Sequence, residues 1–216
     1  SQADVVVVDR LAPRALLDEL DPDVEVIEAG KAPGKHILGQ EEINRLLVDR
    51  ALRGQRVVRL KGGDPYVLGR GSEEADACHR AGVAVEVVPG VTSALAVPAA
   101  AGIPVTARGV TSRFSVVSGH DGPLDFAALA ALEGTLVFLM GVARLGEIAA
   151  ELVAHGRPLD EPVAVVERGT LPDQRVTVAT LGTIAGVARR RGVANPAVIV
   201  VGAVVDLAQV LPAAVS

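Results

Sequence analysis

Residues 56–65 read Arg-Val-Val-Arg-Leu-Lys-Gly-Gly-Asp-Pro, an apolar run that ends abruptly in a turn. The Val- and Leu-rich part, 56–60, is typical of a buried strand, and Gly-Gly-Asp-Pro is typical turn chemistry. Residues 40–53 before it carry apolar side chains at helical spacing, and residues 72–81 after it begin with Ser72 as a candidate N-cap. Helix, strand, turn and helix in this order predict an α/β fold with a mostly parallel sheet and helices on both faces.

The same alternation extends outward in both directions. In the first half we expect further strands at 5–8, 24–27 and 85–88 and a helix over 92–101. The second half predicts strands at 114–118, 135–140, 163–167, 175–179 and 197–201, and helices at 124–132, 143–155 and 181–191. We place a boundary near Ser112, so that 1–112 and 113–216 form two α/β domains.

Composition excludes several classes of function. Hydrophobic residues make up 50% of the chain but aromatic residues only 2%, so the core must consist of Val, Leu, Ile and Ala. The net charge is −5 and no basic patch with aromatic platforms is visible, which argues against nucleic-acid binding. No apolar run approaches the roughly 20 residues that span a bilayer, so no membrane association is expected. With one cysteine, Cys78, and nothing resembling a signal peptide, we expect a cytoplasmic protein.

Unusual residues follow three of the expected strands. Asp9 follows 5–8, Gly62-Gly63-Asp64-Pro65 follows 56–60, and Pro89-Gly90-Val91-Thr92 follows 85–88. Because ligands bind outside the carboxyl ends of strands in open α/β sheets, these turns predict a site at that edge. Spacing alone leaves alternatives open, since Asp9 could simply cap a turn and the Gly-Gly-Asp turn could be ordinary chain reversal.

In several other segments the spacing of residues matches no phosphate-binding or metal-binding motif. Residues 30–35, Gly-Lys-Ala-Pro-Gly-Lys, have one residue too few between the glycines for a phosphate loop, and His36 stands where Ser or Thr should follow. By spacing alone, Lys31 is a solvated loop lysine and Met140 a core residue. The histidines at 36, 79, 120 and 155 show no metal-ligand spacing, so no metal site is expected.

Several of these pieces taken together resemble the tetrapyrrole methylases, over nearly the whole chain and in the family's order and spacing. Arg-Leu-Lys-Gly-Gly-Asp-Pro with the later Glu-x-Gly-Thr is specific to the branch that methylates uroporphyrinogen III on carbon. The residues that carry the resemblance are Ala3–Leu11, Gly30-Lys31, Gln40–Asn44, Val57–Pro65, Gly69–Gly71, Glu73-Glu74, Val88–Ser93, Gly102–Thr106, Met140-Gly141, Glu167–Thr170, Gln174-Arg175 and Pro196-Ala197.

The resemblance implies two α/β domains with a ligand cleft between them, and a homodimer. It implies S-adenosylmethionine as the methyl donor, with S-adenosylhomocysteine as the product. It further implies two successive methyl transfers to uroporphyrinogen III, a tetrapyrrole, giving precorrin-2 for sirohaem or cobalamin synthesis.

Site residues are carried over by position. Asp9 matches the family's proposed proton acceptor and Lys31 its proposed proton donor. Because the tetrapyrrole is a polycarboxylate, arginines that pair bidentately with carboxylates are expected around it. The residues implied to face the tetrapyrrole are Arg70, Glu73, Arg108 and Met140, and those implied to hold the donor are Gly62, Gly63, Asp64, Val67, Thr92, Ser93, Met140, Gly169 and Ala197.

The chain also departs from the family pattern. The family begins with a Gly-rich strand-to-helix turn about two dozen residues before 5–8, and the given sequence does not contain it. Val8, Leu68 and Ala107 stand where Tyr, Phe and His are common. Two alternatives therefore stay open: a tetrapyrrole methylase that acts at another ring position, and a non-catalytic protein that binds tetrapyrroles or nucleosides.

Overall fold

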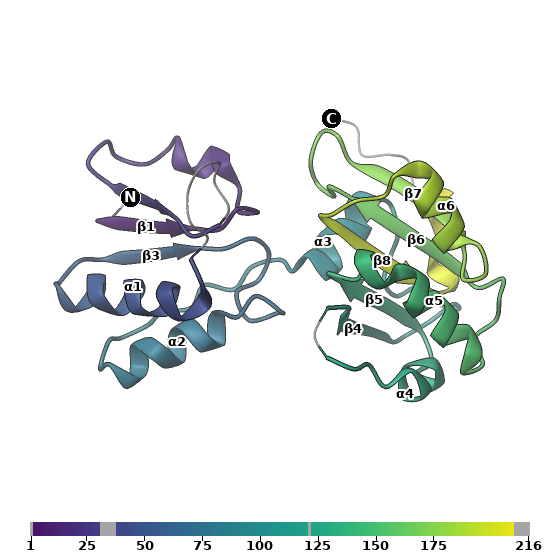
Figure 1. The fold of residues 1–216 in the computed structure, drawn as a ribbon. Helices are drawn as coiled ribbons and strands as arrows, with labels where there is room; N and C mark the ends of the chain where they lie inside the picture. Colours follow the sequence, from purple (N-terminus) through teal and green to yellow (C-terminus); the bar gives the residue numbers. More distant parts are fainter. Residues whose placement is uncertain (1, 31–37, 121, 210–216) are drawn as a thin grey trace. The chain divides into compact units, whose positions relative to one another are not determined.

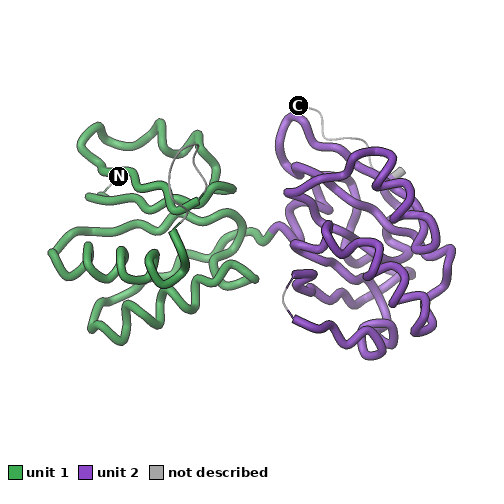
Figure 2. Tube along the Cα trace, viewed as in Figure 1, with its two compact units in different colours: residues 1–92 green, residues 93–216 purple. Residues whose placement is uncertain are grey.

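A computed structural model describes residues 2–30, 38–120 and 122–209 of the chain. It divides into two compact units, Ser1–Thr92 and Ser93–Ser216, coloured separately in Figure 2. This division falls ahead of Ser112, near which the sequence places a domain boundary. Each unit has its own sheet and its own core, and each is described by itself below.

Unit 1 contains a three-stranded parallel sheet in the order β2-β1-β3 (Figure 1). The strands lie close to their expected positions, and all of them run parallel as the sequence predicts. A single 3-10 helix, η1, joins β1 to β2. The elements are β1 (Val5–Val8), η1 (Arg14–Leu17), β2 (Glu25–Glu28), α1 (Gln40–Leu52), β3 (Val57–Leu60) and α2 (Gly71–Arg80).

The central strand, β1, is buried on both faces. Val5 and Val7 pack with Ile43 and Leu47 of α1 and with Cys78 of α2. On the other face, Val6 and Val8 form a smaller cluster, which includes Leu60 of β3 and residues of the β1–β2 connection. Side chains alternate between the faces of a strand, so four consecutive valines satisfy both apolar layers.

Two local expectations in unit 1 are wrong. Residues 85–88 form no strand, because they have no ladder partner within the described chain, and Val87 and Val88 are exposed. Ser72 is not an N-cap either. Helix α2 starts one residue earlier, after Arg70, which has a left-handed φ of 58° and makes no side-chain cap.

Unit 2 contains a five-stranded mixed sheet in the order β4-β5-β8-β6-β7. Strand β4 pairs parallel with β5, whereas β8 pairs antiparallel with both β5 and β6, and β7 antiparallel with β6. The expectation of a mostly parallel sheet is therefore wrong for this unit, because most neighbouring strands in it are antiparallel. The elements are α3 (Ser93–Ala100), β4 (Phe114–Ser118), α4 (Phe126–Ala131), β5 (Thr135–Leu139), η2 (Val142–Arg144), α5 (Leu145–Ala154), β6 (Pro162–Glu167), β7 (Arg175–Thr180), α6 (Ile184–Arg191), β8 (Ala197–Val201) and η3 (Ala203–Gln209).

Two apolar layers cover the faces of this sheet. Leu136 and Phe138 of β5 point to the layer formed with α4, α5 and α6. Val137 and Leu139 point to the opposite layer, where Ala94 and Val97 of α3 pack with residues of β6, β8 and η3. Helix α3 therefore belongs to the core of unit 2, which is why the division between the units precedes it.

No helix among the described residues is both long enough and apolar enough to cross a membrane.

Candidate functional site

The carboxyl ends of β1 and β3 lie side by side, because Val8 pairs with Leu60 in the parallel ladder. Asp9 continues the ladder by donating its N–H to the carbonyl of Leu60 at 3.0 Å. Side chains alternate along strands, so Asp9 shares a face with Val7, while Arg59 and Lys61 share that same face on the neighbouring chain segment. This face is apolar in the middle of the sheet and becomes charged at its carboxyl edge.

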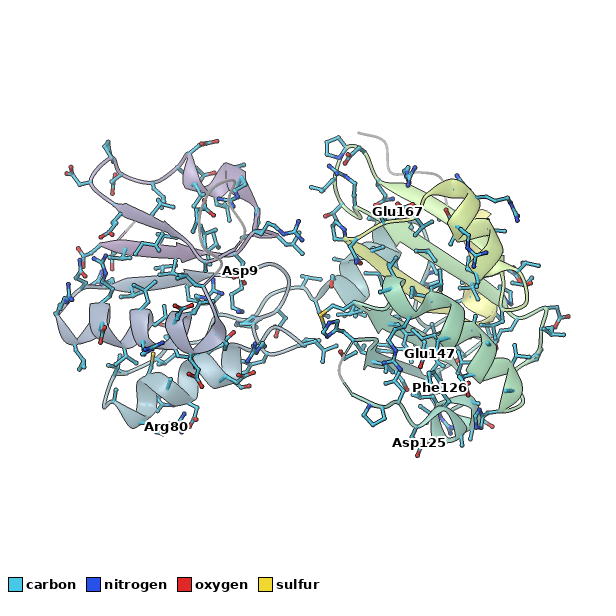
Figure 3. The ribbon with its side chains drawn as sticks, in the orientation of Figure 1. Asp9, Arg80, Asp125, Phe126, Glu147 and Glu167 are labelled. Atoms are coloured by element: carbon cyan, nitrogen blue, oxygen red, sulfur yellow. The ribbon has the colours of Figure 1, made fainter. Side chains whose placement is uncertain are left out.

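Asp9, labelled beyond β1 in Figure 3, is held by two cations. Its Oδ1 accepts a hydrogen bond from Nη2 of Arg59 at 2.5 Å, and its Oδ2 lies 3.5 Å from Nζ of Lys61. Both carboxylate oxygens therefore have a fixed neighbour. Asp9 therefore lies at the sheet edge, where the sequence expects it, and its charge is paired within unit 1.

Glu74 of α2 anchors the same cations from the opposite side. Its Oε1 accepts from Nε of Arg59 at 3.1 Å and from Nζ of Lys61 at 3.2 Å. The side-chain amide of Gln40, at the start of α1, also donates to Oε1 at 3.2 Å. Glu74 is 4% exposed, so this is a buried charge satisfied by three donors.

The glycine turn after β3 is tied to the segment before Thr92. The Asp64 carboxylate accepts from the N–H of Gly90 at 3.0 Å and from that of Tyr66 at 2.8 Å. These two N–H groups, Gly90 first, hold the pKa of Asp64 below its usual value. Only glycine fits at position 90, because a Cβ there would lie 2.2 Å from the carbonyl oxygen of Gly63. Asp64 thus links the turns at 62–65 and 89–92. The sequence predicts that both lie at one edge of the sheet but does not predict this contact.

Arg70 and Glu73, both expected to face the tetrapyrrole, pair with each other. Nε and Nη2 of Arg70 donate to the two carboxylate oxygens of Glu73 at 2.8 and 2.7 Å. The arginine lowers the pKa of Glu73. Both side chains are about half exposed, so the pair is open to a ligand that competes for the guanidinium.

In unit 2 three of the expected donor residues come to one end of the sheet. Met140 follows β5, Gly169 lies just beyond β6, and Ala197 begins β8, which pairs antiparallel with both strands. The backbone there is strained, since Met140, Arg168 and Thr170 have φ values of 59°, 52° and 70°. Such outliers concentrate at functional sites.

Gly169 and Glu167 show how this end of the sheet is built. A Cβ on Gly169 would lie 2.4 Å from Cγ1 of Val97, so glycine lets the β6–β7 turn pack closely on α3. Glu167, labelled in Figure 3, is buried and pairs with Arg175 of β7 at 2.6 Å. The turn that carries Gly169 therefore packs against α3 and follows a strand end held by an ion pair.

Arg108 lies at the other end of the unit 2 sheet. It lines a cavity of about 940 Å³ together with Thr135, the first residue of β5, and Ala203, which follows β8. Met140 follows the last residue of β5, so about 13 Å of strand separates the two ends. The structure does not bring Arg108 to Met140, although the sequence expects both to face one tetrapyrrole.

The remaining expected residues are placed as follows. Val67 lies within the glycine turn, and Thr92 and Ser93 mark the last residue of unit 1 and the first of α3. Lys31 lies outside the described residues. Within the described ranges no cluster of His, Cys, Asp and Glu could hold a metal ion.

Sequence reasoning missed the roles of Arg59, Lys61 and Glu74. A signal was present, since Val57-Val58-Arg59-Leu60-Lys61 puts two cations on one face of an otherwise apolar strand. Buried cations need a buried anion, and nothing in the strand itself identifies Glu74 as that partner. The arrangement offers a carboxylate of fixed direction beside an exposed glycine turn, which suits proton transfer next to a bound small molecule.

The sequence profile described as Tetrapyrrole (Corrin/Porphyrin) Methylases matches residues 1–185. An "S-adenosyl-L-methionine-dependent uroporphyrinogen III methyltransferase" of Methanosarcina barkeri is 52% identical over 97% of this chain and 84% of its own length. A "Uroporphyrinogen-III C-methyltransferase" of Bacillus subtilis is 46% identical over 95% of this chain. The alignment spans only 44% of that protein, so this relative is more than twice as long.

A solved structure shows the same fold. It is a uroporphyrin-III C-methyl transferase of Thermus thermophilus in complex with S-adenyl homocysteine. The two share 43% sequence identity, with a TM-score of 0.80 over 95% of this chain and 88% of the other.

Proposed function

Because the chain belongs to the tetrapyrrole methylase family, we propose that it is an S-adenosylmethionine-dependent uroporphyrinogen-III C-methyltransferase. In this proposal it methylates its substrate twice and releases precorrin-2. The observation that carries the proposal is high identity, over nearly the whole chain, to a protein of that name.

The residues present fit the methyl donor. Gly62 and Gly63 are exposed at the carboxyl end of β3, where backbone groups can approach a ligand. In unit 2, taken by itself, Met140 and the two neighbours of Gly169 have positive φ values. When bound, the sulfonium donor supplies an activated methyl group, so the protein's task is alignment. The full set proposed to hold it is Gly62, Gly63, Asp64, Val67, Thr92, Ser93, Met140, Gly169 and Ala197.

We propose that Asp9 accepts the proton that the pyrrole carbon loses after methylation. Its support is the fixed carboxylate, whose two oxygens are held by Arg59 and Lys61. Arg70 is proposed to bind a substrate carboxylate by exchanging its contact with Glu73. Lys31 as proton donor and Arg108 as a substrate contact are proposed on the family pattern alone.

Finer properties are also proposals. We propose a cytoplasmic homodimer that serves sirohaem or cobalamin synthesis. The single cysteine, free and buried, is consistent with a reducing compartment. Light scattering on the purified protein would measure the oligomeric state directly.

Mass spectrometry of the product tests the function. Incubation with S-adenosylmethionine and uroporphyrinogen III should add two methyl groups, with two equivalents of S-adenosylhomocysteine released. Methylation only of a precorrin, supplied in a parallel reaction, would support a methylase of another ring position. Binding without any release of S-adenosylhomocysteine would support a non-catalytic protein.

A further inference from the structure

Four charged side chains form a cluster between α2 and the carboxyl ends of β1 and β3, namely Asp9, Arg59, Lys61 and Glu74. Arg59 and Lys61 each contact both Asp9 and Glu74, at distances between 2.5 and 3.5 Å. The cluster holds two positive and two negative groups, so its formal charge is zero. Removal of any one member leaves a net charge of one on a largely buried cluster.

Burial within the cluster is graded. The side chains of Glu74, Lys61 and Arg59 are 5%, 8% and 12% exposed, whereas that of Asp9 is 32% exposed. The cluster therefore opens to solvent mainly through Asp9. The three buried side chains can therefore affect a bound ligand mainly through the carboxylate of Asp9.

Arg59 is immobilised on every side of its guanidinium. Nε donates to Glu74, Nη1 donates to the carbonyls of Val7 and Leu60 at 3.2 and 3.3 Å, and Nη2 donates to Asp9. A purely structural link between α2 and the sheet needs only the bond to Glu74. The further bonds fix the direction from which Nη2 reaches Asp9, and so fix its carboxylate.

We propose that Arg59, Lys61 and Glu74 are positioning residues that orient the carboxylate of Asp9, with Glu74 as the anchor that holds both cations. This inference depends on the proposed function, in which Asp9 accepts a proton. Without the charge of Glu74, both cations have Asp9 as their only carboxylate partner in the cluster, so they shift toward it and change the direction of its oxygens. A displacement of about 1 Å in a reacting group can lower a rate about a hundredfold.

The Glu74→Gln variant should lower kcat by about tenfold to a hundredfold. The KM for the tetrapyrrole and the Kd for the donor should change less than about twofold, because the Glu74 side chain is only 5% exposed and leaves little surface for a ligand to contact. Asp76→Asn is the matched control, since Asp76 lies on the same helix and pairs only with exposed Arg80. It should keep wild-type kcat.

A double-mutant cycle with Asp9→Asn separates positioning from structural support. If Glu74 acts through Asp9, Glu74→Gln should change kcat less than about threefold once Asp9 is Asn. The same fold-loss in both backgrounds would overturn the inference. Should Glu74→Gln unfold, Arg59→Lys enters the cycle in its place, since it keeps the charge and loses the fork that fixes Asp9.

Failure of this inference is distinguishable from failure of the proposed function. A wild-type protein that transfers no methyl group to uroporphyrinogen III refutes the function. An active wild type with a fully active Asp9→Asn variant refutes the role of Asp9 and the positioning role with it. An active wild type with a slow Asp9→Asn variant and independent losses in the cycle refutes positioning alone.

Discussion

Replacing Gly90 with alanine perturbs the contact between the two turns at the edge of unit 1. The new Cβ would lie 2.2 Å from the carbonyl oxygen of Gly63, and real Cβ atoms essentially never come within 3.0 Å, so the turns must separate by at least 3.0 − 2.2 = 0.8 Å. The neighbour is backbone, which cannot swing aside as a flexible side chain can. Overpacking of this kind costs about 1–3 kcal/mol.

The separation also weakens the hydrogen bond from the N–H of Gly90 to Asp64. That bond is the largest cause of the lowered pKa of Asp64. A carboxylate with a lowered pKa stabilises the folded protein at pH values above its usual pKa of 3.8. This stabilisation is lost as the pH falls through the lower pKa of the folded state. The difference in stability between wild type and Gly90→Ala should therefore be larger at neutral pH than in acid. Overpacking alone would leave it independent of pH.

Tyr66 reports on this turn, because it is the only tyrosine in a chain without tryptophan. Thermal unfolding followed by its fluorescence should show a Tm at least about 2 °C lower in Gly90→Ala than in wild type. Gly186→Ala is the control, since its nearest neighbour is Nη1 of Arg190 at 3.5 Å and alanine favours its helix. A Gly90→Ala variant as stable as Gly186→Ala would refute the close contact.

Three further predictions concern other sites. Cys78 should react with a thiol reagent only after unfolding, because burial first and then the charge of Glu74 raise its pKa, and rapid labelling of the native protein would contradict this. Arg175→Ala should lower the free energy of unfolding in urea by about 1–3 kcal/mol, because the variant leaves the buried carboxylate of Glu167 without this partner. The loss should be modest, since Arg175 itself is half exposed. An unchanged midpoint of urea unfolding would count against a stabilising role of the pair. Asp9→Asn should lower kcat by about 10²–10⁴-fold and Arg70→Ala should mainly raise the KM for the tetrapyrrole, whereas identical kinetic defects would contradict their separate roles.

Local sequence was sufficient for most elements. The ends of β1 and β8 coincide with those of their apolar runs, because a buried strand must be apolar on both faces for its whole length. The turns after β1 and β3 were also predictable, since Asp9 follows the first run and Gly62-Gly63-Asp64 follows the second. The family motifs identified the proposed donor turn and Asp9 for the same reason: both are short, local patterns.

Pairing across the chain was not predictable in this way. Residues 85–88 have the composition of a strand, yet a strand forms only where a partner completes the hydrogen-bond ladder, and the described chain offers none. In unit 2 the insertion of β8 between β5 and β6 is a choice of neighbour that no periodicity encodes. Alternation along β8 is the same whether its neighbours run parallel or antiparallel.

The amino-acid sequence by itself determined most of the buried segments, most of the turns, and the family to which these patterns belong. Only the tertiary structure decided which charges meet. Glu74 lies on a helix and Arg59 on a strand, and their contact depends on how α2 packs over the sheet. Likewise, the packing of unit 2 places Arg108 beside the start of β5, whereas Met140 follows its end. The apolar composition of a segment favours its burial locally. Contacts between charged side chains depend instead on distances that are set only when helices and strands pack together.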